Sequence, residues 1–296
     1  MAKESVFLSV DWDYFFRPDP FWDWGHSESP FFVNEMWSVR FQSAYAHGMD
    51  LTKRYVPVGH TLFWRALIER GFDFTHAIAF YGDSHLGAYP AFNEAKRRVV
   101  YNFDFHHDLL YQPPDSTISC ENWLYHLLVK RRYTEAVVVY PYPRRKMEFK
   151  DTLDERPELW PMCDRVSCKT IQELSSGERR VERIFIARSG AWTPPWADKA
   201  FMRLVNSCPA LLKIPIINVV PKIGAMGDTV AVRKWDRDAN VARAEQMRNF
   251  IQEVRNGEAN DRLSPGRHVQ GVGGEKRREG AGLAAQEPRG GAVQGA

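Results

Sequence analysis

The 296-residue chain has few cysteines, no long apolar run and little net charge, and each shortage excludes a class of protein. Its four cysteines form neither a Cys-x-x-Cys pair nor a secreted disulfide framework, so we expect reduced thiols. No apolar run approaches the roughly 20 residues that cross a bilayer, and residues 1–5 lead into a strand without a signal-peptide core. A net charge of +3 is too small to indicate a nucleic-acid partner. We therefore expect a soluble, cytoplasmic protein that binds neither nucleic acid nor membrane.

Aromatic residues are missing from one end of the chain, since none follows Phe250. Half of the 20 glycines lie from Asn256 onward, and a segment with so little apolar area cannot offset its ordering entropy. The run Gly-Val-Gly-Gly at 271–274 follows no predicted strand, so it is not a nucleotide-binding loop. We therefore predict one domain over residues 1–255 and a disordered, Gly-rich tail over 256–296.

The rest of the chain alternates strand-like apolar runs with helical patterns. The predicted strands cover 5–10, 75–81, 99–103, 135–140, 181–187 and 214–220, and the predicted helices cover 60–70, 119–132, 194–205 and 238–255. Residues 141–180 are polar and interrupted by proline, so we expect irregular surface excursions there. This alternation is typical of an α/β protein with a mostly parallel sheet.

Three possible metal ligands follow the predicted strand at 99–103. Asp104, His106 and Asp108 occupy alternate positions, and alternate residues of an extended segment point the same way. The competing interpretation is an ordinary strand followed by a polar turn. Carboxylate and imidazole together suit a hard or borderline divalent ion such as Mn²⁺ better than a thiolate-seeking ion. The spacing therefore predicts a metal site just beyond this strand.

Two further strands end in similar residues. Asp11 and Asp13 follow the first predicted strand, and His85 follows the strand at 75–81. Alone, the two acids would indicate a capped turn, and a lone histidine would indicate a core or capping role. Ligands of open parallel sheets bind outside the carboxyl ends of the strands, so three such strand ends predict one shared site.

Residues 14–57 are rich in aromatics and contain several prolines, which argue against a long helix. Two interpretations of this insertion remain open. It either covers the mouth of the predicted site or forms a separate hydrophobic cluster beneath a long loop.

Four blocks resemble the arginase/deacetylase (ureohydrolase) superfamily, and more closely the arginase-like family that includes the peptide arginases of ribosomal-peptide biosynthesis. The blocks at 11–16, 103–110, 121–124 and 186–189 read Asp-Trp-Asp-Tyr-Phe-Phe, Phe-Asp-Phe-His-His-Asp-Leu-Leu, Glu-Asn-Trp-Leu and Ile-Ala-Arg-Ser. The resemblance spans roughly residues 5–220 and implies a three-layer α/β fold. The Asp-x-Asp strand comes first here but late in ordinary arginases, which implies a circularly permuted motif order.

The resemblance also implies a pair of Mn²⁺ ions. The implied ligands are Asp11, Asp13, His85, Asp104, His106 and Asp108. In this arrangement Asp104 and Asp11 bridge the two ions. His85 and Asp108 complete the shell of one ion, and His106 and Asp13 complete the shell of the other.

The activity implied by the resemblance is hydrolysis of a guanidino group. A metal-bridging hydroxide would attack the guanidinium carbon of arginine and leave ornithine and urea. His126 or Glu121 would protonate the departing amine, and His107 is a further candidate. The aromatic insertion and the closer family both favour arginine within a peptide as the substrate. The alternatives are a single-Zn²⁺ deacetylase of the same superfamily and a non-catalytic binding protein that keeps the fold.

Overall fold

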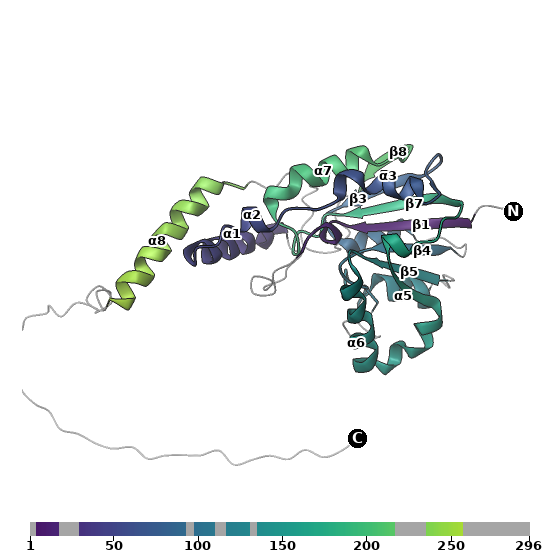
Figure 1. Ribbon diagram of the computed structural model, residues 1–296, viewed down its shortest axis with the longest axis horizontal. Coiled ribbons are helices and arrows are strands. Elements are labelled where there is room, and N and C mark those ends of the chain that lie inside the picture. The colour runs from purple at the N-terminus through teal and green to yellow at the C-terminus, as the bar shows by residue number, and fades with distance from the viewer. Residues whose placement is uncertain are drawn as a thin grey trace, which may run out of the picture. The chain divides into compact units, whose positions relative to one another are not determined.

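The computed structural model describes residues 4–17, 30–92, 98–109, 117–130, 135–216 and 235–256. A sheet of eight strands forms its centre, and every described strand pair is parallel (Figure 1). The strands are β1 (Glu4–Asp11), β2 (Phe72–Asp73), β3 (Ile78–Gly82), β4 (Val99–Phe103), β5 (Glu135–Tyr140), β6 (Val166–Thr170), β7 (Arg179–Ala187) and β8 (Leu212–Pro215). The order across the sheet is β6-β5-β4-β1-β7-β3-β8, and β2 pairs with the start of β7.

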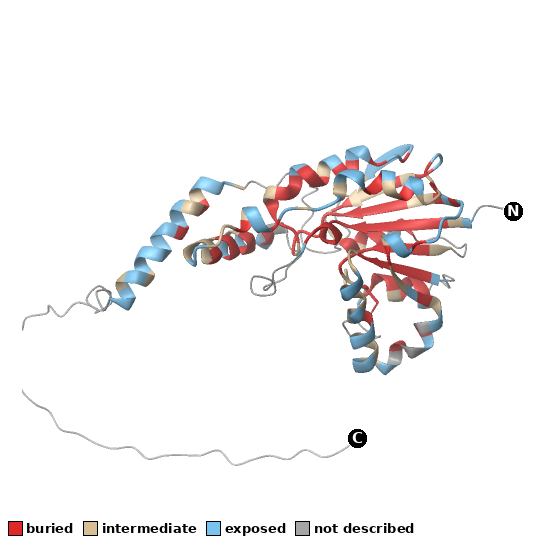
Figure 2. Cartoon of the chain, in the orientation of Figure 1, coloured by how far each residue is buried: buried red, intermediate tan, exposed pale blue. Residues whose placement is uncertain are grey.

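The central strands are buried on both faces, which explains their nearly continuous apolar sequences (Figure 2). In β1, Val6, Leu8 and Val10 pack into one hydrophobic cluster, while Phe7 packs into the other. The neighbouring β4 follows the same alternation, with its residues 99–103 in register with residues 6–10 of β1. The β-branched and aromatic residues of both strands therefore fill the core on either side of the sheet.

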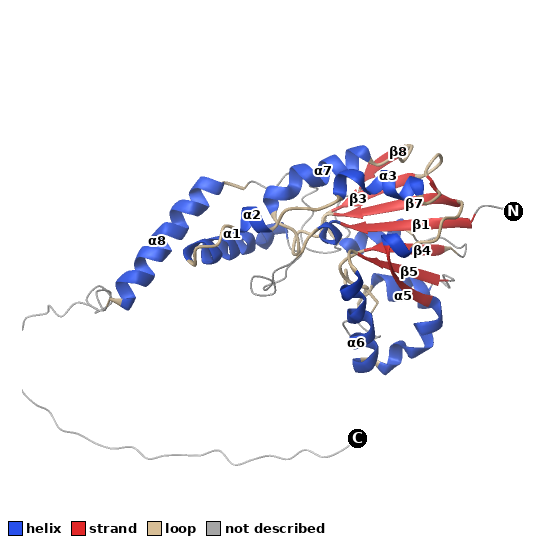
Figure 3. Ribbon diagram, in the orientation of Figure 1, coloured by secondary structure: helices blue, strands red, loops and turns tan. Residues whose placement is uncertain are grey.

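Helices cover both faces of the sheet (Figure 3). The α-helices are α1 (Pro30–Ala46), α2 (Leu51–Arg54), α3 (Phe63–Glu69), α4 (Ala88–Ala91), α5 (Trp123–Lys130), α6 (Met147–Glu155), α7 (Asp198–Ser207) and α8 (Arg237–Arg255). The first cluster joins one face of the sheet to α1, α3 and α7, and the second joins the opposite face to α4, α5 and α6. The fold is therefore α/β, with a parallel sheet between two helical layers as predicted.

Most predicted elements are present, with shifted ends. The predicted strands at 99–103 and 135–140 coincide with β4 and β5. The strand predicted at 75–81 begins later, at Ile78, because Thr75 and the residues around it form a turn capped by Asp73. The last predicted strand begins earlier than expected, as β8, and residues 217–220 lie outside the described part of the chain.

The prediction that residues 14–57 contain no long helix is wrong. Helix α1 runs from Pro30 to Ala46, and Pro30 is its first residue, where proline's missing N–H and fixed φ are tolerated. Its side chains Trp37 and Phe41 are fully buried and pack edge-on against Trp196. These aromatics therefore belong to the main core and do not form a separate cluster.

The prediction of irregular structure over residues 141–180 is also wrong. This stretch contains α6 and β6, and β6 pairs with β5 in parallel as the edge strand of the sheet. An edge strand is covered less completely, so polar residues such as Ser167 and Lys169 are accepted in it. That composition concealed the strand in the sequence.

The chain divides into two units, residues 1–250 and residues 251–296. Of the second unit the structure describes only residues 251–256, which include the end of α8. The predicted tail after Asn256 therefore lies outside the described residues. Among the described helices, none has both the length and the apolar character required to cross a bilayer.

Candidate metal centre

The predicted ligands meet at the carboxyl edge of the sheet, because the strands that carry them are neighbours. Asp11 is the last residue of β1, and Asp104 directly follows β4, which pairs with β1. After β1 the chain first forms β2 and β3 on one side of that strand and then β4 on the other. A topological switch point therefore lies beside β1, where parallel sheets bind their ligands.

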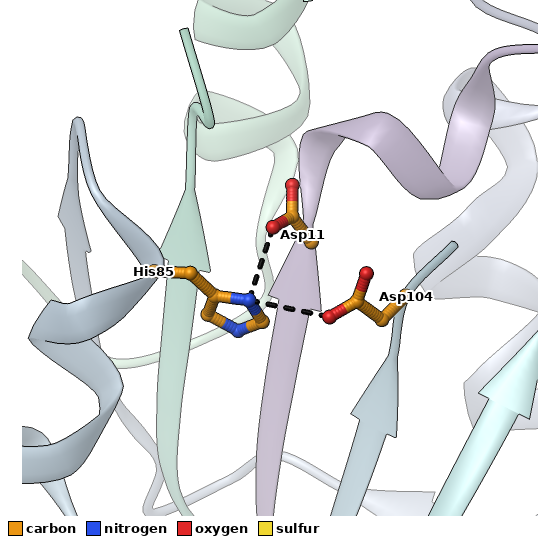
Figure 4. A group of neighbouring side chains, drawn as sticks. All are labelled: Asp11, His85 and Asp104. Carbon is orange, nitrogen blue, oxygen red and sulfur yellow. Dashed lines mark ion pairs between the residues drawn. The ribbon is translucent and has the colours of Figure 1, made fainter. Parts of the chain in front are cut away.

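His85 reaches this edge from the turn after β3, across the end of β7 (Figure 4). The turn lies close against β7 because Gly87 has no side chain, and a Cβ there would overlap the Phe185 ring. The His85 ring stacks on the same ring, with an interplanar angle of 10°. The packing of β7 therefore sets the position of His85.

Three carboxylates converge on one nitrogen of His85. Its Nδ1 lies 2.8 Å from Asp108 Oδ2, 3.0 Å from Asp11 Oδ2 and 3.2 Å from Asp104 Oδ2. A ring nitrogen carries at most one proton and can serve only one of these oxygens well. One nitrogen and three carboxylate oxygens around a point are a donor set that fits a divalent cation.

A second group adjoins the first. His106 Nδ1 lies 2.9 Å from Asp13 Oδ2 and 3.7 Å from Asp104 Oδ1. Asp104 thus presents one oxygen to each imidazole. Two sets of three residues have ligand atoms close enough for an ion, Asp11 with His85 and Asp104, and Asp13 with Asp104 and His106. The structure therefore brings together all six predicted ligands and places Asp104 between the two groups.

The buried carboxylates of the centre carry more negative charge than nearby cationic side chains balance. Burial raises the pKa of Asp13 well above its usual range, and repulsion from Asp11 and Asp104 raises it further. Burial, together with repulsion from Asp104, raises the pKa of Asp108 to about 8. Buried carboxylates of this kind require either protons or compensating cations.

The two imidazoles respond in the opposite sense. Burial acts to lower the pKa of His85, but the carboxylates of Asp108 and Asp11 outweigh burial and raise it well above the usual range. The pKa of His106 is likewise raised, because the charge of Asp13 outweighs burial. For Asp104, burial acts to raise the pKa, but hydrogen bonds from both imidazoles hold it well below its usual range. Protonated imidazoles thus supply the charge that the carboxylates lack.

A further polar side chain holds each ligand of the first group. Ser189 Oγ donates to Asp11 Oδ2 at 2.5 Å, Asn102 Nδ2 to Asp104 Oδ2 at 3.1 Å, and Trp123 Nε1 to Asp108 Oδ2 at 2.6 Å. Ser9 Oγ lies 2.6 Å from His85 Nε2, the nitrogen that faces away from the three acids. A hydrogen bond at the second ring nitrogen fixes the tautomer and orientation of a ligating histidine.

These supporting residues were missed in the sequence, although a signal was present. Ser9 and Asn102 are polar residues inside otherwise apolar strands, each two positions before a predicted ligand and on the same face. They are also paired across β1 and β4. Trp123 and Ser189 fall within the blocks that carry the family resemblance, but no spacing rule connects them to Asp108 or Asp11.

The backbone is strained at two points of the centre. Asp108 has φ 52° and Ser189 has φ 45°, and they are the non-glycine residues with positive φ in the described ranges. Such residues cluster where the surrounding structure fixes a functional geometry. Two side chains of α1 hold the loop after Ser189, since Trp37 Nε1 donates to Gly190 O at 2.8 Å and Arg40 Nη1 donates to Ala191 O at 3.2 Å. Helix α1 therefore fixes the loop that follows Ser189.

A cavity of about 480 Å³ opens beside the ligands. Its lining combines ligand side chains with residues of other loops, namely Asp11, His85, His106, Asp108, Cys120, Glu121, Arg145, Glu148, Ser189 and Trp192. Arg145 is paired with Glu148 at 3.2 Å and donates to Phe105 O at 2.7 Å. Burial raises the pKa of Glu148 to about 9. The cavity wall is thus acidic and partly aromatic.

The predicted catalytic candidates fall in different places. Glu121 lines the cavity. His126 is buried in α5 and is not among the residues that line the cavity. His107 is buried with its Nε2 2.9 Å from Thr152 Oγ1, and burial lowers its pKa to about 3.

The chain matches no family model, no curated protein and no solved structure. The resemblance to the arginase superfamily therefore stays a prediction from sequence blocks.

Proposed function

We propose that this protein is a metal-dependent hydrolase that uses two Mn²⁺ ions to cleave a guanidino group, with arginine in a peptide as the preferred substrate. The products would be ornithine and urea. The observation that carries the proposal is the pair of buried histidine–carboxylate groups that share Asp104. A permuted arginase-like fold, implied by the sequence blocks, is part of the same proposal.

The donor set favours Mn²⁺ over softer ions. Both groups consist of carboxylate oxygens and imidazole nitrogens, without a thiolate. The second group also favours two ions over one, because a single-metal deacetylase would have no use for the pair formed by Asp13 and His106. Four carboxylates balance the charge of two divalent cations.

Two adjacent divalent ions supply a nucleophile at neutral pH by lowering the pKa of water, and they stabilise charge that develops on the substrate. Glu121 lies at the cavity wall, where its carboxyl group can give a proton to the departing amine. His126 is less suited to that role, because it is buried away from the cavity lining. Ser189 and Trp123 keep Asp11 and Asp108 oriented toward the centre during the reaction.

The charges in the cavity support a peptide over free arginine. A free amino acid brings an α-carboxylate that requires a cation in a closed site. Arg145 is the only Arg or Lys among the described residues of the lining, and contacts with Glu148 and with the Phe105 carbonyl already hold its guanidinium. In a peptide the backbone is uncharged. The buried aromatics of α1 do not support a peptide groove, since Trp37 and Phe41 are covered.

The test is a metal analysis of the purified protein combined with mass spectrometry. We expect two Mn²⁺ per chain and loss of CH₂N₂ from an Arg-containing peptide. Asp11→Asn should lose manganese and activity, and Asp151→Asn, on the exposed surface of α6, is the matched control. One ion per chain would support the deacetylase alternative, and no ion would support a non-catalytic protein. Urea release from free arginine without change in any peptide would reject the peptide substrate.

A further inference from the structure

Asp108 differs in its backbone from Asp11, the acid that ends β1. Its φ of 52° lies in the left-handed region, whereas Asp11 is extended, with φ −83° and ψ 138°. A non-glycine residue keeps a left-handed conformation only where its surroundings fix it. From that conformation the Asp108 carboxylate reaches to 2.8 Å from His85 Nδ1. The contacts that hold the Asp108 backbone therefore decide where this ligand points.

One of these contacts comes from the preceding residue. The buried imidazole of His107 accepts a hydrogen bond at Nδ1 from Leu109 N at 3.0 Å, so the ring bridges the two neighbours of Asp108. Because Nδ1 accepts, the proton of the neutral ring is on Nε2. That nitrogen lies 2.9 Å from Thr152 Oγ1, whose hydroxyl donates to Glu148 O at 2.9 Å. These hydrogen bonds run in one direction and fix both the tautomer and the orientation of the ring.

Helix α5 holds the same peptide group at its other end. Leu124 N donates to Asp108 O at 3.2 Å, and Tyr125 N donates to it at 3.4 Å. The carbonyl of Asp108 and the N–H of Leu109 belong to one peptide group, so α5 holds its oxygen and His107 holds its nitrogen. The orientation of this rigid peptide group sets ψ of Asp108. His107 therefore acts on the conformation that aims the carboxylate.

We propose that His107 is a positioning residue of the metal centre, which aims Asp108 at the ion of the first group by holding the peptide group that follows it. This inference rests on the proposed function only in requiring that the first group binds a divalent ion. His107 is buried and is not among the residues that line the cavity, so it acts through Asp108. The competing interpretation is a histidine that only packs against Phe149 of α6.

The test compares two substitutions of His107 by competition of Mn²⁺ with a fluorescent chelator. His107→Phe keeps a ring but has no acceptor, and it should weaken binding of the first-group ion by about 10- to 100-fold. His107→Asn carries an oxygen on Cγ that can accept from the amide two residues ahead, and it should recover most of that loss. Asp13→Asn removes a ligand of the second group alone and shows which measured affinity belongs to the first group.

Thr152 offers a second pair of variants, outside the segment that carries the ligands. Thr152→Val keeps the shape of the side chain but removes the acceptor of His107 Nε2–H, and it should weaken the same ion by roughly three- to tenfold. Thr152→Ser keeps the hydroxyl and should bind the ion more tightly than Thr152→Val. If the thermal midpoints show that the His107 variants do not fold, this pair decides the test.

The proposal stands if His107→Asn binds the first-group ion more tightly than His107→Phe. A packing role predicts the reverse, because phenylalanine fills the space of the imidazole better than asparagine does. Equal affinities within the deciding pair would also overturn the proposal. The predicted order in a protein that hydrolyses no Arg peptide would retain this inference and reject the proposed activity. Hydrolysis with equal affinities would do the opposite, and a wild type that binds no divalent ion would overturn both.

Discussion

The two ligand groups of the centre are built differently. The His85 side chain is 2% exposed, whereas the His106 side chain is 20% exposed. Each ligand of the first group accepts from or contacts a further polar side chain. In the second group backbone amides hold the two acids, with Phe105 N donating to Asp13 at 3.2 Å and His106 N donating to Asp104 at 2.8 Å. A rigid, dry group beside a more open one predicts a tight ion and a weaker ion.

The largest expected effect follows removal of the charge shared by both groups. Asp104→Asn should reduce metal content to less than one ion per chain and lower peptide hydrolysis by roughly a thousandfold or more, because both ions lose a ligand. Atomic absorption and mass spectrometry measure the two quantities. Unchanged metal stoichiometry would contradict the shared role of Asp104.

Asp13→Asn is the matched comparison, because Asp13 belongs to the second group alone. This substitution should abolish binding of the weaker ion and leave the tighter ion bound, which gives about one ion per chain. Loss of both ions in Asp13→Asn would mean that the groups do not differ in the predicted way.

A smaller effect is expected where a supporting residue of the first group is removed. Ser9→Ala deletes the partner of His85 Nε2 and should weaken the tighter ion by about 10- to 100-fold without altering the weaker one. Competition with a fluorescent chelator measures both affinities. Ser167→Ala, exposed on β6, is the control and should match the wild type. Equal affinities in Ser9→Ala and the control would show that Ser9 does not orient His85.

The metal-free protein should become less stable as the pH rises from about 5 to about 9. The folded-state pKa values of Asp13 and Asp108 lie above the unfolded value of about 3.9, so the folded chain holds more protons in this range. The raised pKa values of His85 and His106 act in the same direction, since their stabilisation is present below about 6.5 and is lost as the pH passes their folded values.

The thermal midpoint of chelator-treated protein, measured across this range, checks the sign. Protein saturated with Mn²⁺ should show a flatter profile, because the ions replace the protons as counter-charges. A midpoint of the metal-free protein that rises with pH would contradict the assignment of Asp108 and Asp13.

The smallest effect is expected from the end of the chain. Truncation after Gly257 should leave the thermal midpoint and both metal affinities unchanged, because the removed residues contain no aromatic and are rich in glycine. Differential scanning fluorimetry and the chelator competition measure this. A change in the affinity for either ion would show that the tail acts on the centre.

The sequence predicted the convergence of these side chains well because their positions depend on short-range periodicity. Asp104 and His106 are placed by a single strand and its end, and the parallel order of strands brings Asp11 beside them. Two of the side chains that hydrogen-bond to the first group could not be predicted in this way. Trp123 meets Asp108 only because α5 packs under the turn after β4, and such a contact between distant segments leaves no local pattern.

Helix α1 and strand β6, which the sequence did not predict, were also missed because their local patterns are weak. Helix α1 has almost no amphipathic stripe, and apolar residues occur around most of its circumference, so its packing could not be inferred from periodicity. Edge strand β6 was not predicted for the opposite reason, because the residues at its exposed positions are polar enough to resemble a loop. In both cases tertiary contacts decided the structure where local preference was weak.

If two ions bind as proposed, the position of Asp104 links the two binding events thermodynamically. One carboxylate turns one oxygen toward each group, so an ion held by the first group would fix the rotamer that a second ion requires. Electrostatic repulsion between the cations opposes this effect, and the balance of the two is a coupling free energy. Linkage requires that this free energy be the same whichever ion binds first. The shape of a single Mn²⁺ titration therefore reports how the side chain of Asp104 is shared.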